Sequence, residues 1–260
     1  MHPQTPHPYA PPVPPAPHTA PAPHPAPATS AAPAPHPAPA TSAAPAPPAP
    51  ERTLLVPFYD HPADRPDAWE TLIAAAPRLY GVVLNPASGA GQAPDAVFAE
   101  AAARLRAAGV PVLGYADTDY GRRPHADVVR DLLRHRDWYG ADGAFLDQAA
   151  TDPALLAHYR RLSVAARAAG ARTLVLNHGT HPHPGYAALA DLLVTYEGTW
   201  TAYPGAGAPQ WTLAHPPERF CHLVYAAPHG ARPTTPVHCV VPGDAPHPWG
   251  TLPYLLEPAR

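Results

Sequence analysis

Residues 143–177 read GAFLDQAATDPALLAHYRRLSVAARAAGARTLVLN and contain a complete strand–helix–strand pattern. The run at 143–147 is apolar up to a terminal Asp, and the run at 173–177 is apolar up to a terminal Asn. Between them, Asp152-Pro153 is a typical helix start, apolar residues recur at helical spacing, and Gly170 follows the last turn. Strands that are apolar throughout are typical of a parallel sheet with both faces covered. The stretch therefore predicts one β–α–β unit.

The same alternation extends to both sides of this unit. Helix starts at Pro94 and Pro124 precede further amphipathic runs. Eight strands alternating with helices predict a (β/α)8 TIM barrel. The late connections are short, so we expect shortened late helices, because a parallel crossover needs a dozen or more residues. An open doubly wound sheet is the alternative, but no G-x-G-x-x-G follows the first strand. The other predicted strands are 53–59, 81–85, 111–117, 192–197, 220–226 and 237–241.

The first part of the chain has a different composition. Residues 1–50 hold 20 of the 43 prolines and none of the charged residues, and a 12-residue pattern repeats at 23–34 and 35–46. With few large apolar side chains, such a segment cannot offset the entropy of ordering it. We expect 1–52 to be a disordered Pro/Ala/His-rich tail and 53–260 to form the barrel. An inert polyproline II spacer, a stalk, an O-glycosylated segment and a ligand for a proline-reading domain all fit this composition.

Deleting residues 1–50 is expected to leave the thermal stability of the remaining chain unchanged, because the tail offers no apolar area to bury. Calorimetry of the full and shortened chains measures this directly. A clear fall in Tm on deletion would contradict the prediction.

The composition also excludes several functions. All 17 basic residues are arginine, which excludes a Schiff-base, P-loop or kinase-type lysine. A net charge of −3 without a basic cluster argues against nucleic-acid binding. The sequence contains no run of about 18 apolar residues, so it predicts no membrane span. The N-terminus shows no signal-peptide pattern. Two cysteines, Cys221 and Cys239, are expected to be buried thiols rather than a disulfide.

Polar and aromatic residues gather where the predicted strands end. In a TIM barrel the active site lies at the carboxyl ends of the strands, so these side chains should share one face. Asp147 and Glu197 each follow an apolar run directly and are the candidate catalytic residues. The candidate substrate-binding residues are Tyr59, Asn85, Asp117, Asp119, Tyr120, Gln148, Asn177, Tyr196, Trp200 and Trp249.

Two carboxylates from different strands are what glycoside hydrolysis requires. One protonates the leaving oxygen, and the other attacks or stabilises the developing oxocarbenium ion. We expect Asp147 and Glu197 to lie about 5–5.5 Å apart, the separation of retaining enzymes. Alternatively, both carboxylates are structural and pair with Arg122 and Arg123.

A metal site is a third possibility. Three histidines, His178, His181 and His183, follow the fifth predicted strand. Catalytic zinc sites in barrels usually draw their ligands from several strands, and the first strand here carries no H-x-H. We therefore expect neither a metal nor another cofactor.

Several ordered motifs carry a family resemblance. They are LLVPFY at 54–59, VVLNPASGAG at 82–91, DWYGADGAFLDQ at 137–148, NHG at 177–179, YEG at 196–198 and HPWGTLP at 247–253. With these motifs the chain resembles the spherulin 4 (spherulation-specific family 4) proteins over 53–257. The resemblance implies a (β/α)8 barrel and kinship with microbial glycoside hydrolases that cut galactosamine or N-acetylgalactosamine polymers. Asp147 and Glu197 match two functional carboxylates of those enzymes, whereas Gln148 stands where they carry Glu.

Two functions follow from these observations. The first is an amino-sugar glycosidase with Asp147 as nucleophile and Glu197 as acid/base. The second is a non-catalytic polysaccharide-binding or cell-surface protein on the same barrel, which Gln148 favours because an amide cannot transfer a proton. The expected partner is a polysaccharide or oligosaccharide, and we assume a monomer. The resemblance suggests an extracellular or cell-surface location.

Overall fold

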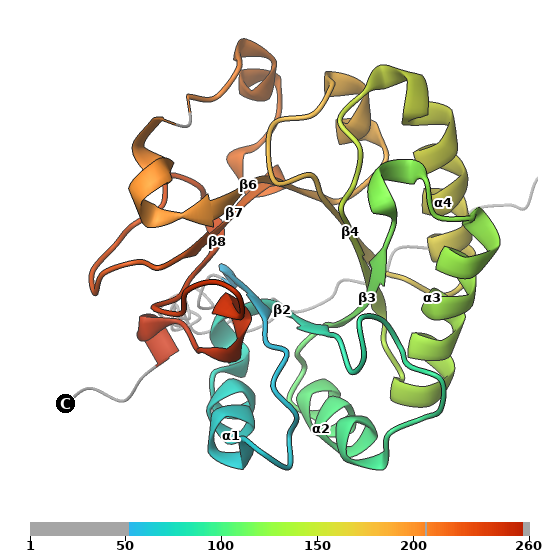
Figure 1. Cartoon of the computed structure of the whole chain (residues 1–260), viewed down its shortest axis with the longest axis vertical. Coiled ribbons are helices and arrows are strands. Elements are labelled where there is room, and N and C mark those ends of the chain that lie inside the picture. The colour runs from blue at the N-terminus through green and yellow to red at the C-terminus, as the bar shows by residue number, and fades with distance from the viewer. Residues whose placement is uncertain (1–51, 206, 257–260) are drawn as a thin grey trace, which may run out of the picture. The chain divides into compact units, whose positions relative to one another are not determined.

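A computed structural model describes residues 52–205 and 207–256, which form a closed barrel of eight parallel strands (Figure 1). Each strand pairs with the next one along the chain, and the barrel closes where Leu54 pairs with His238. The closed order confirms the predicted TIM barrel over the open sheet. The strands are β1 (Leu54–Pro57), β2 (Leu79–Leu84), β3 (Val112–Asp117), β4 (Gly143–Asp147), β5 (Thr173–Asn177), β6 (Leu192–Thr199), β7 (Phe220–Tyr225) and β8 (Val237–Val240).

Full helices cover only the first half of the barrel (Figure 1). They are α1 (Pro66–Ala74), α2 (Ala96–Ala107), α3 (His125–Tyr139) and α4 (Leu156–Ala168). Asp95 caps α2 by accepting the N–H groups of Val97 and Phe98, and Gly140 ends α3 in the left-handed conformation at φ 63°. Past α4, the described residues form only short 3-10 turns between strands. The connection between β7 and β8 is short, but the one between β6 and β7 is about as long as the connection that holds α1. The shortened late helices are thus confirmed.

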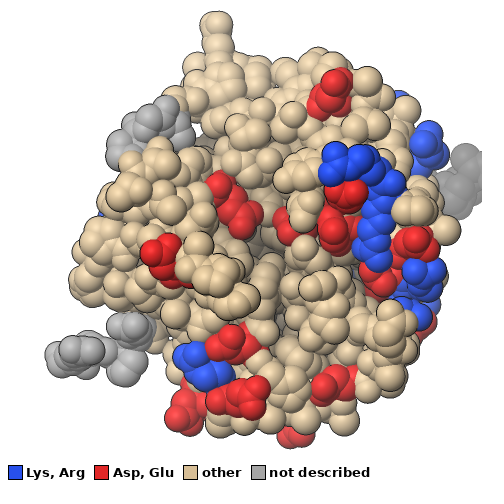
Figure 2. All heavy atoms as spheres, in the orientation of Figure 1, with Lys and Arg blue, Asp and Glu red and all other residues tan. Residues whose placement is uncertain are grey.

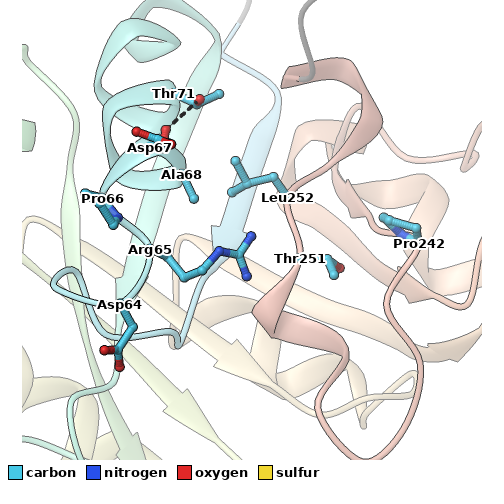
Figure 3. Close-up of a pocket in the computed structure, with 9 residues that line it drawn as sticks. All are labelled: Asp64, Arg65, Pro66, Asp67, Ala68, Thr71, Pro242, Thr251 and Leu252. Carbon is cyan, nitrogen blue, oxygen red and sulfur yellow. Dashed lines mark hydrogen bonds between the residues drawn. The ribbon is translucent and has the colours of Figure 1, made fainter.

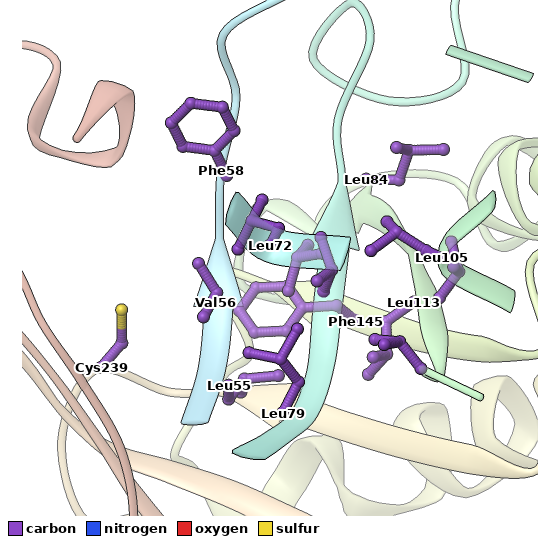
Figure 4. Packing of buried hydrophobic residues seen from close by; sticks show 14 of the residues in the cluster. Leu55, Val56, Phe58, Leu72, Leu79, Leu84, Leu105, Leu113, Phe145 and Cys239 are labelled. Carbon is purple, nitrogen blue, oxygen red and sulfur yellow. The ribbon is translucent and has the colours of Figure 1, made fainter. Parts of the chain in front are cut away.

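The largest core cluster among the described residues packs β1, β2 and β3 against α1 and α2 (Figure 4). Leu55, Leu79 and Leu113 come from three neighbouring strands, while Leu72 and Leu105 come from the two helices, and all five are fully buried. Burying each such side chain contributes about 1.5–3 kcal/mol. Cys221 and Cys239 are also fully buried, as free thiols, in agreement with the sequence. This packing fixes the strands whose ends carry the polar residues.

Gly114 lets α3 approach β3 closely. A Cβ at this position would lie 2.5 Å from the His135 side chain, so a larger residue would push the helix away. The His135 Nε2 lies 2.8 Å from the Tyr115 carbonyl oxygen and donates to it. Burial lowers the pKa of His135 to about 4, so the ring is neutral. The helix therefore holds the strand at Tyr115, a residue of the site described below.

Some expectations lie outside this structure. The tail predicted for 1–52 falls almost entirely outside the described residues, and its boundary at residue 53 stays a prediction. Among the described helices, none has the length and apolar character needed to cross a membrane.

Candidate active site

A polar cavity of about 420 Å³ opens at the carboxyl ends of the strands. Figure 2 shows acidic side chains within and around the hollow at the centre of this face, and basic side chains along one side of it. The cavity combines both candidate carboxylates with amide and aromatic groups, as the strand-end pattern predicts. It is lined by Tyr120, Asp147, Gln148, Asn177, His178, Gly179, Glu197 and Tyr225.

Asn177 joins the two carboxylates. Its Nδ2 donates to Asp147 Oδ1 at 2.6 Å and to Glu197 Oε2 at 2.5 Å. Since both distances start from one nitrogen, the two oxygens lie no farther apart than their sum, about 5.1 Å. A contact this close between one oxygen of each group is compatible with the separation of about 5–5.5 Å between the carboxyl groups of retaining glycosidases.

The outer oxygens of the pair are held by aromatic donors. The Tyr115 hydroxyl donates to Asp147 Oδ2 at 2.8 Å, and the Trp249 Nε1 donates to Glu197 Oε1 at 3.3 Å. Burial and the nearby Asp147 raise the pKa of Tyr115 far above its usual value, so its hydroxyl stays protonated. Each carboxylate is therefore fixed at both oxygens before any substrate enters.

Hydrogen bonds from Thr118 and Tyr120 to backbone carbonyl groups connect the ends of β3 and β4. The buried Thr118 hydroxyl lies 2.9 Å from the Asp147 carbonyl oxygen and 2.8 Å from that of Gln148. The Tyr120 N–H donates to the Gln148 carbonyl at 2.8 Å. Tyr120 and Gln148 both adopt left-handed backbone conformations, at φ 53° and 48°, which are unfavourable for residues with a side chain. The contacts hold this strained rim in place, and both side chains line the cavity.

Burial shifts the acidity of both carboxyl groups upward. Desolvation, followed by repulsion from Asp147, raises the pKa of Glu197 to about 7. Desolvation also raises the pKa of Asp147, although hydrogen bonds from Tyr115, the Gln148 backbone and Asn177 oppose this effect. Two carboxyl groups this close resist simultaneous ionisation. The geometry therefore favours one ionised and one protonated group near neutral pH.

The nearby arginines are paired elsewhere. Arg122 pairs with Asp119, and Arg123 lies 2.5 Å from Asp131. Among the ion pairs of the described residues, none involves Asp147 or Glu197. The alternative that both carboxylates are held by arginines therefore does not describe this site.

Comparison with known proteins identifies the family. The family model described as spherulation-specific family 4 matches residues 53–242. The chain belongs to this family. Spherulin-4 of Physarum polycephalum is 34% identical to it over 149 residues, which cover 55% of this chain and 44% of that protein. The alignment therefore spans less than half of the relative's length.

One solved structure shares the barrel of this spherulation-specific family 4 chain, and a second superposes less well. Aspergillus clavatus Sph3, solved in complex with GalNAc, superposes with a TM-score of 0.68 at 22% identity and covers 80% of this chain and 95% of its own. A chitinase from Chromobacterium violaceum ATCC 12472 has a TM-score of 0.46 at 14% identity and covers 68% of this chain and 69% of its own. The likeness to Sph3 supports the fold.

Six of the ten predicted substrate-binding residues lie at or beside the carboxylate pair. Tyr120, Gln148 and Asn177 line the cavity, and Trp249 contacts Glu197. The Tyr59 ring packs against Tyr115, the residue that donates to Asp147, with ring centroids 6.0 Å apart, and burial with repulsion from the two carboxylates raises the pKa of Tyr59. Asp117 pairs with Asp147 in strand register and adds to the rise in its pKa.

The other four predicted residues do not reach the cavity, each for a local reason. The Asn85 Oδ1 accepts the Gly89 N–H at 2.7 Å and stabilises its own loop. Asp119 turns to Arg122 on the exposed rim. Because side chains alternate along a strand and Glu197 faces the cavity, Tyr196 faces outward, where it packs against Tyr203. Trp200 stacks on the same ring, with centroids 5.3 Å apart. We leave these four out of the proposed site.

The sequence reasoning missed Tyr115 and Tyr225. Tyr115 lies two residues before Asp117 on β3, and Tyr225 is the last residue of β7. The alternation of side chains along a strand puts Tyr115 on the same face as Asp117, so that spacing was the available signal. Polar strand ends alone did not reveal it, because Tyr115 lies inside an apolar run.

The three histidines considered as metal ligands have separate environments. The His178 Nδ1 contacts the Ala149 carbonyl, and the His183 Nδ1 accepts the Gly185 N–H. His181 lines a different pocket. Among the described residues, no group of three or more His, Cys, Asp or Glu side chains is placed to hold a metal ion.

A hollow of about 450 Å³ lies beside the mouth, between the start of α1 and the segment 242–252 (Figure 3). Its most prominent polar group is Arg65, whose guanidinium already binds Asp60 at 2.8 Å and the Gly250 carbonyl at 3.0 Å. The hollow contains neither carboxylate of the pair, so it is not the proposed active site.

Replacing Tyr115 with phenylalanine is expected to lower any hydrolytic kcat by about 10- to 100-fold, because Asp147 loses a hydrogen bond to its charged form. Tyr139→Phe is the matched control, since its hydroxyl contacts the Ala90 carbonyl instead of the carboxylate pair. Comparing kcat for the two variants measures the effect. Equal activity in Tyr115→Phe and wild type would rule out this positioning role.

Proposed function

We propose that the chain is a glycoside hydrolase that acts on an amino-sugar polysaccharide containing galactosamine or N-acetylgalactosamine. The observation that carries this proposal is the carboxylate pair of Asp147 and Glu197, joined by Asn177 inside an open polar cavity. The family membership and the GalNAc bound to Sph3 support an amino sugar as the substrate.

The charge of the cavity favours the same substrate class. Its described lining contains two carboxylates and neither Arg nor Lys. Asp117 adds further negative charge, because its repulsion contributes to the raised pKa of Asp147. Such a field attracts the ammonium group of a de-N-acetylated sugar, tolerates a neutral acetamide and repels the carboxylate of a uronic acid.

Each carboxylate has a role that its surroundings support. Glu197, with a pKa near 7, is suited to give a proton to the leaving oxygen and later to take one from water. Asp147 receives hydrogen bonds from Tyr115 and Asn177 that favour its ionised form, as an attacking carboxylate requires. In the retaining reaction, Asp147 forms a bond to the anomeric carbon as the leaving oxygen takes the Glu197 proton. Water then breaks that bond and returns the proton to Glu197.

Gln148 favours a second candidate function, polysaccharide binding without cleavage. Its side chain lines the cavity and cannot transfer a proton. The proposed mechanism assigns no proton transfer to this position, so cleavage does not depend on it.

Incubation of the full chain with α-linked oligomers of N-acetylgalactosamine and of galactosamine tests the proposal. Mass spectrometry should detect shortened products from these oligomers and none from a polyuronate of equal length. Binding without shortened products would instead establish the non-catalytic alternative. The Glu197→Gln variant controls for contaminating hydrolases.

The pH profile of kcat/KM is expected to be bell-shaped with its maximum below pH 7. Glu197 must be protonated to act as the acid, so activity falls tenfold per pH unit as the pH rises above about 7. Asp147 must be ionised, so activity also falls at low pH, and this limb starts above the usual pKa of 3.8 because the Asp147 pKa is raised. Initial rates across the pH range measure both limbs, and a flat profile through pH 9 would contradict the assignment.

A further inference from the structure

A further pocket, of about 440 Å³, lies on the outer wall of the barrel at β6 and β7. Thr195 of β6 and His222 of β7 line it. A register shift between Val194 and Tyr196 interrupts the alternation of side chains on β6, so Thr195 lies on the outer face although Glu197 lies in the mouth cavity. Cys221 on β7 lies in the core. This is the side where short turns replace full helices (Figure 1). The turn Gln210–Ala214 and the loop before β8 complete the walls.

Most of the hydroxyl groups around this pocket are already used. The Thr212 hydroxyl donates to the Pro209 carbonyl at 2.8 Å, and the Thr235 hydroxyl donates to the Val237 carbonyl at 2.9 Å. The Thr234 hydroxyl lies 3.0 Å from that of Tyr203. With Leu213 and Phe220 also in the lining, the pocket offers mainly methyl, methylene and aromatic surface.

Two buried polar groups remain available in the lining. Thr195 is 1% exposed, and its hydroxyl has no hydrogen-bond partner in the described part of the chain. His222 is 4% exposed, and its Nδ1 lies 2.8 Å from the Tyr203 hydroxyl. No hydrogen bond within 52–205 and 207–256 involves the other ring nitrogen of His222. An unpaired buried hydroxyl is unfavourable, so a ligand that forms a hydrogen bond with Thr195 removes a destabilising feature of the empty pocket.

The charge of the pocket selects a neutral ligand. Its described lining contains no Asp, Glu, Arg or Lys. Burial lowers the pKa of His222 to about 4 and also lowers that of His181, so both rings are neutral at pH 7. A charged ligand would lose its hydration without gaining a counter-charge.

The small number of unpaired polar groups also distinguishes this pocket from a sugar-binding site. A sugar ring carries a hydroxyl on most of its carbons, and each one buried without a partner is unfavourable. Two free polar groups on an apolar wall cannot satisfy such a ring. They suit a molecule with an apolar body and one head that both donates and accepts a hydrogen bond.

We propose that this outer pocket binds a neutral, mainly apolar small molecule whose single donor–acceptor head group pairs with the Thr195 hydroxyl and the His222 ring. The inference is independent of the proposed hydrolase activity, because it uses none of the residues of the mouth cavity.

Fluorine NMR titration of the full chain tests the pocket with 4-fluorobenzamide, whose amide both donates and accepts. The wild-type chain should bind it saturably. It should bind 4-fluorobenzoate and 4-fluorobenzylammonium at least about tenfold more weakly, because neither charge is compensated. Absence of saturable benzamide binding, or equal binding of the charged compounds, would overturn the proposal.

Two variants locate the binding. Thr195→Val keeps the side-chain shape, removes the hydroxyl and should weaken benzamide binding about three- to tenfold, while leaving the binding of 4-fluorotoluene unchanged. Ala208→Trp places a large ring at the pocket rim and should abolish binding, whereas the exposed Ala107→Trp on α2 is the matched control. Undiminished benzamide binding in both Thr195→Val and Ala208→Trp would place the compound elsewhere and refute the site.

Discussion

Replacing Glu197 with glutamine is expected to lower kcat on amino-sugar oligomers by about 10²- to 10⁴-fold, the usual contribution of a positioned general acid. Glutamine keeps the size of the side chain, but its single amide oxygen can accept from only one of the two donors, Asn177 or Trp249, and it has no proton to give. The loss should be largest for substrates with poor leaving groups. An activated aryl glycoside, whose leaving oxygen needs no proton, should be cleaved with a much smaller loss.

A stability measurement separates this loss from misfolding. The pKa of Glu197 is about 7 in the folded chain against 4.5 for an ordinary Glu. The unfolded chain therefore releases this proton at lower pH, and wild-type stability falls as the pH rises from about 4.5 through 7. At 1.36 kcal/mol per pKa unit the full effect is about 3 kcal/mol. Glu197→Gln should thus equal wild type in stability near pH 4 and exceed it at pH 8.

Glu70→Gln is the matched control, because Glu70 on α1 is an exposed partner of Arg104 on α2. It should leave kcat unchanged and keep the fall in stability towards pH 7, because Arg104 lowers the pKa of Glu70 instead of raising it. Wild-type kcat in Glu197→Gln would remove this residue from the mechanism, and a Glu197→Gln chain that is less stable than wild type at pH 8 would contradict the buried-charge argument.

The barrel could be predicted because its signals are local and repeated. The ranges 143–147 and 173–177 match β4 and β5 residue for residue, since each is a short apolar run that ends in a polar residue, which leaves little choice of boundary. The short connection between β7 and β8 could also be anticipated, because so few residues leave no room for a full crossover helix. The connection between β6 and β7 is long enough for a helix and nevertheless forms only 3-10 turns. What replaces those helices could not be predicted: the 3-10 turns and the outer pocket depend on tertiary contacts such as that of Tyr203 with His222.

The site was most predictable where a residue ends a strand or directly follows one. Asp147, Asn177 and Gln148 were found in this way, because a strand that ends at the mouth must present its last side chains there. Tyr196 was included for its type and position, yet its neighbour Glu197 faces the cavity and Tyr196 consequently faces outward. The bridging role of Asn177 was not predictable either, since it depends on the spacing of three neighbouring strands.

Replacing Asp147 with asparagine is expected to lower kcat by about 10³-fold or more, the order lost when a covalent nucleophile is removed. An amide keeps the shape of the side chain and can still accept from Tyr115, so the fold and oligosaccharide binding should survive. Loss of the Asp147 charge also removes one of the two causes that raise the pKa of Glu197. The alkaline limb of any residual activity should therefore shift to lower pH than in wild type.

Chemical rescue distinguishes an attacking Asp147 from a residue that only stabilises the fold. In Asp147→Ala, azide should enter the vacated space, attack the anomeric carbon of an activated aryl glycoside and give a glycosyl azide of inverted configuration. Asp119→Ala is the matched control, since Asp119 pairs with Arg122 on the rim, and it should keep its activity without azide. Full hydrolysis by Asp147→Asn would defeat the carboxylate pairing outright. Loss of activity that azide does not restore would leave Asp147 as an electrostatic partner of Glu197 and exclude it as the nucleophile.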